Sequence, residues 1–278
     1  MQFVATIMTN MDAAIITFLA IMGAGLGSFA CCQAWRLRKR DKSARSHCMN
    51  CKYQLKWYDN IPVLSWLLLL GKCRKCHKPI GFAEIIAEVG LAALFALSFA
   101  FWPNRDDLLA GNVLEVAKYI VFLVQLVVFT ILAVYDAKWK EMPTSILLVS
   151  IVTGLAYFVL NIVLIVLTGK FSSDLVMSIV GAMIILPGFY YFMYKASKET
   201  WVGSGDAILC VSLAVMLGDF WLAMFCLFGS NMIGSVVMLP VTAAKKEKHA
   251  MIPFGPFLIA GFLVVFFLQD AIINFVSF

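Results

Sequence analysis

The sequence predicts an all-α polytopic membrane protein, and three observations support this fold class. Of the 278 residues, 62% are hydrophobic and only 14% are charged, whereas a soluble domain carries about 45–50% apolar and about 25% charged residues. The third observation is that apolar segments of roughly 20 residues, the length of a membrane-spanning helix, recur along the chain. We therefore expect one helical membrane domain rather than two soluble domains.

About eight transmembrane helices are expected from this pattern. Residues 1–20 carry a single charge, Asp12, and the apolar stretch continues to about Trp35, so no cleaved signal peptide is expected. Only residues 218–220 separate the sixth segment from the seventh, and the sixth is short for a full crossing. The expected spans are 11–35, 84–103, 115–135, 145–168, 174–194, 205–218, 222–241 and 251–274.

The basic residues orient these spans. Residues 36–83 hold twelve of the 22 Lys and Arg residues, and with three later loops they bring the total on one side of an eight-span arrangement to 19. The positive-inside bias makes that side cytoplasmic and places both termini opposite. Because the charge lies in loops between apolar segments, it fits membrane lipids as partners and disfavours nucleic acid. The three later loops are residues 136–144, 195–204 and 242–250.

The chain accordingly divides into three regions. Residues 1–35 are expected to form the first transmembrane helix, residues 36–83 a cytoplasmic loop, and residues 84–278 a transmembrane bundle. Gly23 and Gly27 form a small-xxx-small pair in the first helix, which predicts close packing against another helix.

Four of the eight cysteines lie in the cytoplasmic loop as two Cys-x-x-Cys pairs, Cys48 with Cys51 and Cys73 with Cys76, separated by 21 residues. This spacing is typical of a four-cysteine zinc site. Stable disulfides are disfavoured in a reducing compartment, so we expect a structural Zn²⁺, with redox-active dithiols as the alternative. A zinc ion held by four sulfurs has no open position for water, so its role would be to hold the loop together.

Two aspartates lie where an apolar segment meets its flanking loop. Asp136 ends the third span, and Asp206 begins the sixth within Gly203-Ser204-Gly205-Asp206. Ionisable residues at membrane depth are rare and are functional candidates by default. The predicted orientation puts both carboxylates near the cytoplasmic surface, which allows them to meet across the bundle.

A pair of neighbouring carboxylates can hydrolyse an amide. The two cannot both ionise cheaply, so they share one proton and titrate as a unit. One can then activate water while the other protonates the leaving nitrogen. Gly203 and Gly205 supply backbone freedom for an extended substrate to approach. Asp136 and Asp206 thus favour aspartyl proteolysis at a membrane surface, and the structural alternative for either is a helix cap.

Several stretches of the chain resemble the type IV prepilin peptidases. The resemblance covers nearly the whole chain, and the nine-residue motif at residues 58–66 is its most specific part. Tyr135-Asp136, with Pro143 seven residues after the aspartate, and the glycine-rich run ending at Asp206 also fit. The remaining matching stretches are residues 27–29 (GSF), 58–66 (YDNIPVLSW), 71–76 (GKCRKC) and 252–257 (IPFGPF).

This resemblance implies a bifunctional enzyme of the bacterial inner membrane, serving type IV pili or type II secretion. Such enzymes cut the basic leader from prepilins and pseudopilins after a glycine at the cytoplasmic face, and commonly methylate the new N-terminal amine with S-adenosylmethionine. By position, Asp136 and Asp206 correspond to the catalytic aspartates. The four loop cysteines correspond to the metal-binding set.

The chain departs from the family pattern at a few positions. A lysine commonly stands two residues after the second aspartate, where this chain has Ile208, and the usual Arg-Tyr-Pro before the second helix is replaced by Ala83-Glu84-Ile85. Glu88 matches a recurrent glutamate and lies one helical turn from Glu84. Glu84 and Glu88 are either an interfacial acidic pair neutralised by the basic loop or contacts for the substrate or methyl donor. The chain has no glycine-rich Rossmann fingerprint, so methylation rests on the resemblance alone.

Two other classes of protein remain as alternatives. A presenilin-like intramembrane protease also pairs a Tyr-Asp with a Gly-x-Gly-Asp, but the cysteine loop after the first helix favours prepilin processing. A proton-coupled transporter would carry carboxylates nearer the middle of the bilayer and an internal repeat. No repeat is found, and both aspartates lie at one surface.

Overall fold

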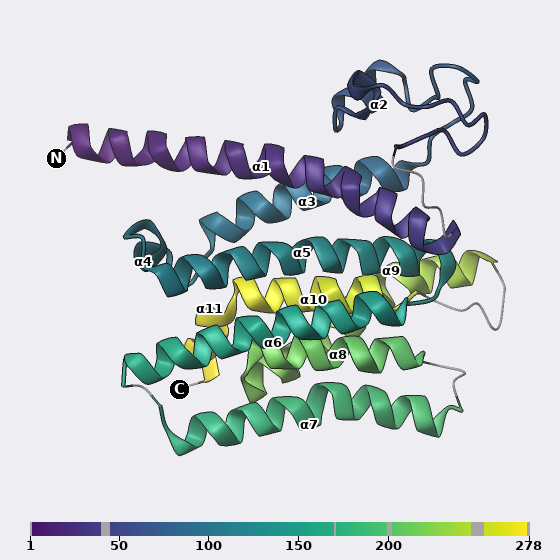
Figure 1. Cartoon of the computed structure of the whole chain (residues 1–278). Helices are drawn as coiled ribbons and strands as arrows, with labels where there is room; N and C mark the ends of the chain where they lie inside the picture. The colour runs from purple at the N-terminus through teal and green to yellow at the C-terminus, as the bar shows by residue number, and fades with distance from the viewer. Residues whose placement is uncertain (1, 40–44, 170, 199–201, 246–252, 277–278) are drawn as a thin grey trace. The chain divides into compact units, whose positions relative to one another are not determined.

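The computed structural model describes residues 2–39, 45–169, 171–198, 202–245 and 253–276, and the backbone alone for residues 2–10 and 241–245. Predictions for residues 40–44, 199–201 and 246–252, which include parts of three basic loops and the start of the last span, lie outside these ranges. The described chain is helical between its loops, with no β-strand in it (Figure 1). The elements are α1 (Gln2–Lys39), η1 (Trp57–Asn60), α2 (Leu64–Leu68), α3 (Phe82–Ala100), α4 (Arg105–Leu109), α5 (Val113–Trp139), α6 (Thr144–Leu167), α7 (Ser173–Ala196), α8 (Ser204–Leu217), α9 (Phe220–Lys245), α10 (Gly255–Phe267) and α11 (Gln269–Val276).

Each of the eight predicted spans coincides with helix, but six helices are long and apolar enough to cross a membrane by themselves. The helix α8 has 14 residues, which at 1.5 Å per residue gives about 21 Å, less than the roughly 30 Å of hydrocarbon in a bilayer. The last predicted span is broken into α10 and α11, which meet at a bend of 70°. Among the described residues there are therefore six candidate crossings, or seven if the bent pair is one span.

The break between α8 and α9 has a local cause. Gly218 adopts a left-handed conformation with φ of +59° and ends α8, as a C-terminal glycine commonly does. The next residue, Asp219, then accepts a hydrogen bond from the backbone N–H of Leu222 at 3.0 Å and begins α9. These two adjacent residues therefore divide the apolar segment into two helices.

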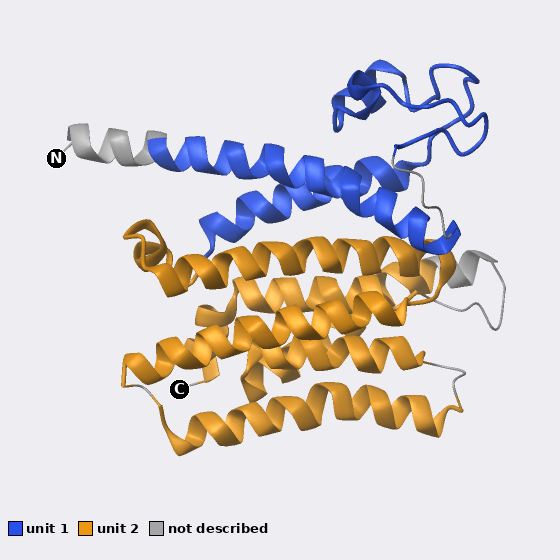
Figure 2. Cartoon of the chain, viewed as in Figure 1, with its two compact units in different colours: residues 1–102 blue, residues 103–278 orange. Residues whose placement is uncertain are grey.

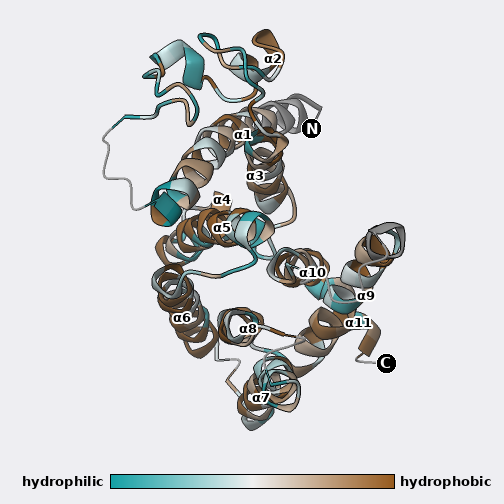
Figure 3. Cartoon of the chain, turned by 90° about the vertical axis from the view of Figure 1, so that its right-hand side faces the viewer, coloured by the Kyte–Doolittle hydropathy of each residue, from teal (hydrophilic) through white to brown (hydrophobic). Residues whose placement is uncertain are grey.

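The described chain forms two compact units, residues 1–102 and residues 103–278 (Figure 2). The expected division into residues 1–35, 36–83 and 84–278 stays a prediction. Figure 3 shows hydrophobic residues along the helices, whereas hydrophilic residues gather in the loop between α1 and α3 and at helix ends. We call residues 45–81 the cysteine loop.

In the first unit, α1 and α3 pack closely. A Cβ atom on Gly23 would lie 2.6 Å from the carbonyl oxygen of Leu91, and one on Gly27 would lie 2.6 Å from that of Ala87. Any larger residue at these two positions would push the helices apart, so the predicted small-xxx-small packing is confirmed.

In the second unit, α8 is the most enclosed helix, with ten of its 14 residues buried. It packs against α6 and α7, while α10 packs against α5 and α9. Aromatic rings fill the space between α5 and α10: Phe122 stacks on Phe266 with ring centroids 4.4 Å apart, and Phe129 meets Phe262 edge to face at 5.4 Å. This packing fixes the two helices that carry Asp136 and its hydrogen-bond partner.

Candidate active site and metal centre

Asp136 lies in the last turns of α5 and is buried, with 5% of its surface exposed. The helix ends three residues later at Trp139, and the next residue, Lys140, adopts a left-handed conformation and donates its backbone N–H to the carbonyl oxygen of Asp136 at 2.7 Å. The Asp136 carboxylate accepts the backbone N–H of Gly255, 2.9 Å from Oδ2. The start of α10 therefore holds the Asp136 side chain near the end of α5.

Asp206 lies in the first turn of α8 and is also buried, with 8% of its surface exposed. Its Oδ2 accepts the backbone N–H of Gly203 at 3.2 Å, so the carboxylate caps its own helix. Its Oδ1 is buried and accepts no hydrogen bond from the described residues. A buried carboxylate oxygen without a donor is costly unless water or a ligand satisfies it.

The structure brings the two aspartates to one place. The Met142 side chain lies against Gly205, the residue before Asp206, and against Gly255, whose N–H bonds to Asp136. A Cβ on Gly205 would come within 2.9 Å of the Met142 Cβ, and one on Gly255 would lie 2.9 Å from Asp136 Oδ2. The glycines thus make room at the pair, and the role of Gly203 and Gly205 in substrate approach stays a prediction.

The contact from Gly255 was missed by the sequence analysis. The segment that contains it, residues 252–257, matched the family pattern, but no local feature says that a backbone N–H there reaches a carboxylate 119 positions earlier. Only the packing of α10 on α5 makes the contact.

A buried polar network also ties the aspartate-bearing helices together. The Gln125 amide of α5 donates to Ser150 Oγ of α6 at 2.8 Å and to Ser212 Oγ of α8 at 3.4 Å. Ser150 Oγ donates to Ser212 Oγ at 3.0 Å, and Thr153 of α6 donates to the other side of the Gln125 amide. The four side chains satisfy one another inside the bundle, which fixes the register of α5 and α8. Uncharged residues scattered over three apolar helices gave no signal for this network in the sequence.

Glu84 and Glu88 of α3 have different surroundings. Glu88 is buried, and its Oε2 accepts the backbone N–H of Val63 at 2.7 Å. Val63 has φ of +62°, a conformation that β-branched residues rarely adopt, so Glu88 holds a strained point of the cysteine loop. Glu84 accepts the indole N–H of Trp35 at 3.4 Å and lines a cavity beside the loop.

The four loop cysteines form one cluster, with all four sulfur atoms within 4.8 Å of one another. The Sγ atoms of Cys48 and Cys76 are 3.9 Å apart, as are those of Cys51 and Cys73. A tetrahedral zinc with Zn–S bonds of about 2.3 Å places its sulfurs about 3.8 Å apart. The donor set and its spacing therefore fit a four-thiolate metal site.

Each Cys-x-x-Cys pair sits in the same kind of turn. The N–H of Cys48 bonds to Tyr53 O at 2.8 Å, and that of Cys73 to Lys78 O at 2.9 Å. Lys52 and His77, each four residues after the first cysteine of its pair, have φ of +54° and +55°. Two copies of one turn, 25 residues apart, thus present their sulfurs to a common point.

Polar contacts hold the second turn in place. The Arg74 guanidinium bonds to Asp59 Oδ1 at 2.7 Å, which joins this turn to η1. The backbone N–H of Lys78 and then the side-chain amide of Asn50 lower the pKa of the Cys76 thiol to about 6, because both stabilise the thiolate.

Comparison with known proteins gives a consistent result. Residues 21–102 match the bacterial peptidase A24 N-terminal domain, which ends where the first compact unit ends. Proteins described as prepilin leader peptidase/N-methyltransferase from Legionella pneumophila and Vibrio cholerae are 27% and 26% identical, over 88% and 92% of this chain and 82% and 98% of theirs. The protein of that description from Bacillus subtilis is 29% identical over 94% of this chain and 97% of its own. No solved structure matches the chain.

Proposed function

We propose that this chain, which is similar to prepilin leader peptidases over most of its length, is a membrane aspartyl endopeptidase that removes the basic leader from type IV prepilins or pseudopilins. The observation that carries this proposal is the buried pair of Asp136 and Asp206. The two aspartates come from helices far apart in the sequence, and Asp206 keeps one oxygen without a donor from the described residues.

The pair would work through a shared proton. One carboxylate takes a proton from a water molecule as that water attacks the scissile carbonyl carbon, and the other donates a proton to the leaving nitrogen as the C–N bond breaks. The Gly255 N–H on Asp136 and the Gly203 N–H on Asp206 hold the carboxylates in place at 2.9 Å and 3.2 Å. Asp206 Oδ1, which has no donor among the described residues, would accept a hydrogen bond from the attacking water.

The four loop cysteines would hold a structural Zn²⁺. Sulfur separations of 3.9 Å in both cross pairs support four-thiolate coordination. With all four positions taken by sulfur, the metal would stabilise the loop and leave hydrolysis to the aspartates. One metal ion accounts for the positions of all four sulfurs, so a redox-active dithiol is not needed to explain the cluster.

The second proposed activity is methylation of the new N-terminal amine with S-adenosylmethionine. Its support is that the similar proteins are described as both leader peptidase and N-methyltransferase. The methyl donor would supply the transferred group, and this chain would have to bind it at a site separate from the aspartate pair.

We place the enzyme in the bacterial inner membrane with the cysteine loop and the aspartates at the cytoplasmic face. The concentration of 19 of the 22 basic residues in loops on one side supports that orientation. Its partners would be prepilin or pseudopilin substrates and membrane lipids. A proton-coupled transporter is less well supported, since Asp136 and Asp206 lie near helix ends rather than in the middle of a helix.

The test is cleavage by the full chain purified in detergent. A prepilin peptide is incubated with wild type, Asp136→Asn and Asp206→Asn, and the product N-terminus is read by mass spectrometry. We expect each variant to lose about a thousandfold or more in rate, because neither amide can exchange the proton. Asp219→Asn is the matched control: asparagine also caps a helix, so cleavage should persist. Cleavage at the wild-type rate by either dyad variant would contradict the mechanism.

A further inference from the structure

A groove in the second unit runs between α7 and α8 and reaches the first turn of α8, where Asp206 lies. The two helices lie side by side in Figures 1 and 3. The groove has a volume of about 480 Å³, within the roughly 300–1,000 Å³ of ligand pockets. Ser204 and Ala207, which stand on either side of Asp206 in the sequence, both line it. The groove therefore adjoins the aspartate site, although the proposed hydrolysis gives it no role.

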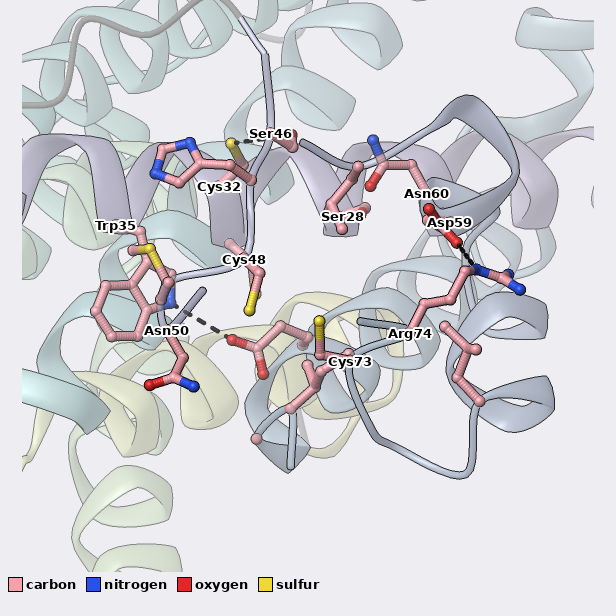
Figure 4. A pocket seen from close by; sticks show the side chains of 18 of the residues that line it. Ser28, Cys32, Trp35, Ser46, Cys48, Asn50, Asp59, Asn60, Cys73 and Arg74 are labelled. Atoms are coloured by element: carbon pink, nitrogen blue, oxygen red, sulfur yellow. Dashed lines mark hydrogen bonds and ion pairs between the residues drawn. The ribbon is translucent and has the colours of Figure 1, made fainter. Parts of the chain in front are cut away.

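The lining of this groove carries no charged side chain among the described residues. The cavity beside the cysteine loop is different, since Asp59 and Arg74 form an ion pair at its wall (Figure 4). Lys195 lies against two rings that line the groove, with its Nζ 5.8 Å and 5.6 Å from the ring centroids of Tyr191 and Tyr194. A cationic side chain of a leader peptide would lose water in the groove without gaining a carboxylate partner. The groove thus suits an uncharged, apolar peptide.

Ile208 makes the α8 side of the groove apolar. It is half-buried and lines the groove together with Val211, nearly one helical turn further on. The prepilin peptidases that this chain resembles commonly have a lysine two residues after the second aspartate, where Ile208 stands. A lysine there would bring a cation into the groove, so the isoleucine leaves an apolar lining in place of a charged one.

The α7 side of the groove offers a backbone acceptor. Pro187 lies inside α7 and has no N–H, so the helical hydrogen bond to the carbonyl oxygen of Met183 cannot form. Both residues line the groove. A carbonyl group in apolar surroundings is costly unless a donor reaches it. A bound peptide brings backbone N–H donors, whereas a lipid acyl chain brings none.

We propose that the groove between α7 and α8 binds the apolar stretch of the substrate that follows the cut, an inference that rests on the proposed endopeptidase function. The uncharged lining and the nearby Lys195 exclude the basic leader, so the chain on the other side of the scissile bond is the segment that fits. Ile208 is then a specificity-determining residue, because it favours substrates with apolar side chains after the cut.

Photocrosslinking locates the bound segment without requiring cleavage. Peptides carry a benzophenone side chain either within the basic leader or at one of the positions after the cut, and each is irradiated with the full, metal-loaded chain that carries Asp136→Asn. Mass spectrometry then identifies the labelled residues. We expect the probes after the cut to label α7 or α8 along the groove, and the leader probes to label residues elsewhere. Labelling of the groove by the leader probes, or of other helices alone by the probes after the cut, would overturn the proposal.

Filling the groove should remove this labelling. A Cβ on Gly188 meets nothing within 4 Å, so Gly188→Trp puts an indole in the groove without displacing the backbone. We expect labelling by the probes after the cut to fall about tenfold, the low end of what a contact in a hydrophobic pocket contributes. Gly229→Trp is the matched control, because a Cβ there also meets nothing within 4 Å and Gly229 lies outside the lining. Equal yields in the two variants would contradict the assignment, as would a phospholipid that native mass spectrometry finds still bound under saturating peptide.

Ile208 is tested through a ratio of two substrates. Cleavage is measured for prepilin peptides that carry either leucine or glutamate at the position that labels the groove. Ile208→Lys should lower the leucine-to-glutamate ratio of kcat/KM about tenfold or more, and Ile208→Leu should keep it. An effect of the new charge on Asp206 acts on both peptides and cancels from the ratio, so an unchanged ratio would refute the role of Ile208. Cleavage without groove labelling would remove the groove and leave the peptidase, whereas groove labelling without cleavage would do the reverse.

Discussion

The cysteine loop and the aspartate pair hold their functional side chains by different means. Of residues 45–81, only three are buried, Asp59, Gly71 and Cys73, and α2 within this loop buries none. In α8, which carries Asp206, ten of 14 residues are buried. The loop therefore has little packing of its own and depends on four sulfurs meeting at one point, whereas the bundle positions its carboxylates by close helix contacts.

The two regions should therefore respond differently to substitution. A loop held by one centre should fail as a whole when that centre is removed, because structural metal binding and local folding are coupled. At a packed site, the catalytic rate should fall according to how far a catalytic atom is displaced, because a shift of about 1 Å can cost about a hundredfold in rate.

Removing the metal should have the largest effect and should be confined to the loop. Cys48→Ser combined with Cys73→Ser takes one ligand from each turn, and the lost binding free energy is about 10 kcal/mol or more for a structural zinc. We expect the metal to disappear from elemental analysis and the loop amides to exchange hydrogen at least about a hundredfold faster, while α8 keeps its protection. Cys32→Ser, outside the cluster, should keep the metal. Unchanged metal content in the double variant would contradict four-thiolate coordination.

An added methyl group at Gly255 should damage the aspartate site selectively. The Cβ of Gly255→Ala would lie 2.9 Å from Asp136 Oδ2, so the carboxylate or α10 must move. We expect cleavage to fall about a hundredfold with a stability cost of about 1–3 kcal/mol, and metal binding to remain. Gly229→Ala is the control, because a Cβ there meets nothing within 4 Å. Normal cleavage by Gly255→Ala would show that the pair tolerates displacement.

The sequence predicted the two centres for different reasons. The cysteines were identifiable because their ligand spacing is local and repeated, and the structure brings all four together. Asp136 and Asp206 were identifiable because a carboxylate in an apolar chain is conspicuous. The contacts that hold these aspartates in place were not identifiable from the sequence. The Gly255 contact spans 119 positions, and such contacts depend on which helices become neighbours.

The helices show a similar limit. Apolar length predicted eight helical segments, and each contains helix among the residues that the structure describes. Whether a segment crosses the bilayer alone depends on where the helix stops, and that is decided by single residues. Gly218 ends α8 after 14 residues, and Leu268 separates α10 from α11 at the 70° bend. Hydropathy averaged over about 20 residues does not register such stops.

The smallest effect is predicted for the buried network around Gln125. It tests whether this network, as well as helix packing, positions the aspartates. Gln125→Leu leaves the Ser150–Ser212 hydrogen bond in place but removes the links from α5, which should cost about 1 kcal/mol, as polar contacts in membrane helices do. If the network sets the register of the aspartates, kcat should fall more than KM changes, and Gln125→Asn should recover part of the loss.

A double-mutant cycle separates this positioning role from general destabilisation. Gln125→Leu and Ser150→Ala share a 2.8 Å hydrogen bond, so their effects on kcat should be non-additive. Ser98→Ala removes a buried hydroxyl of α3 that donates to Phe95 O at 2.8 Å, outside the unit that carries the aspartates, and should leave kcat near wild type. Additive effects, or equal losses of kcat in the Ser98 control, would mean that helix packing alone sets the distance between the carboxylates and that the polar network serves stability.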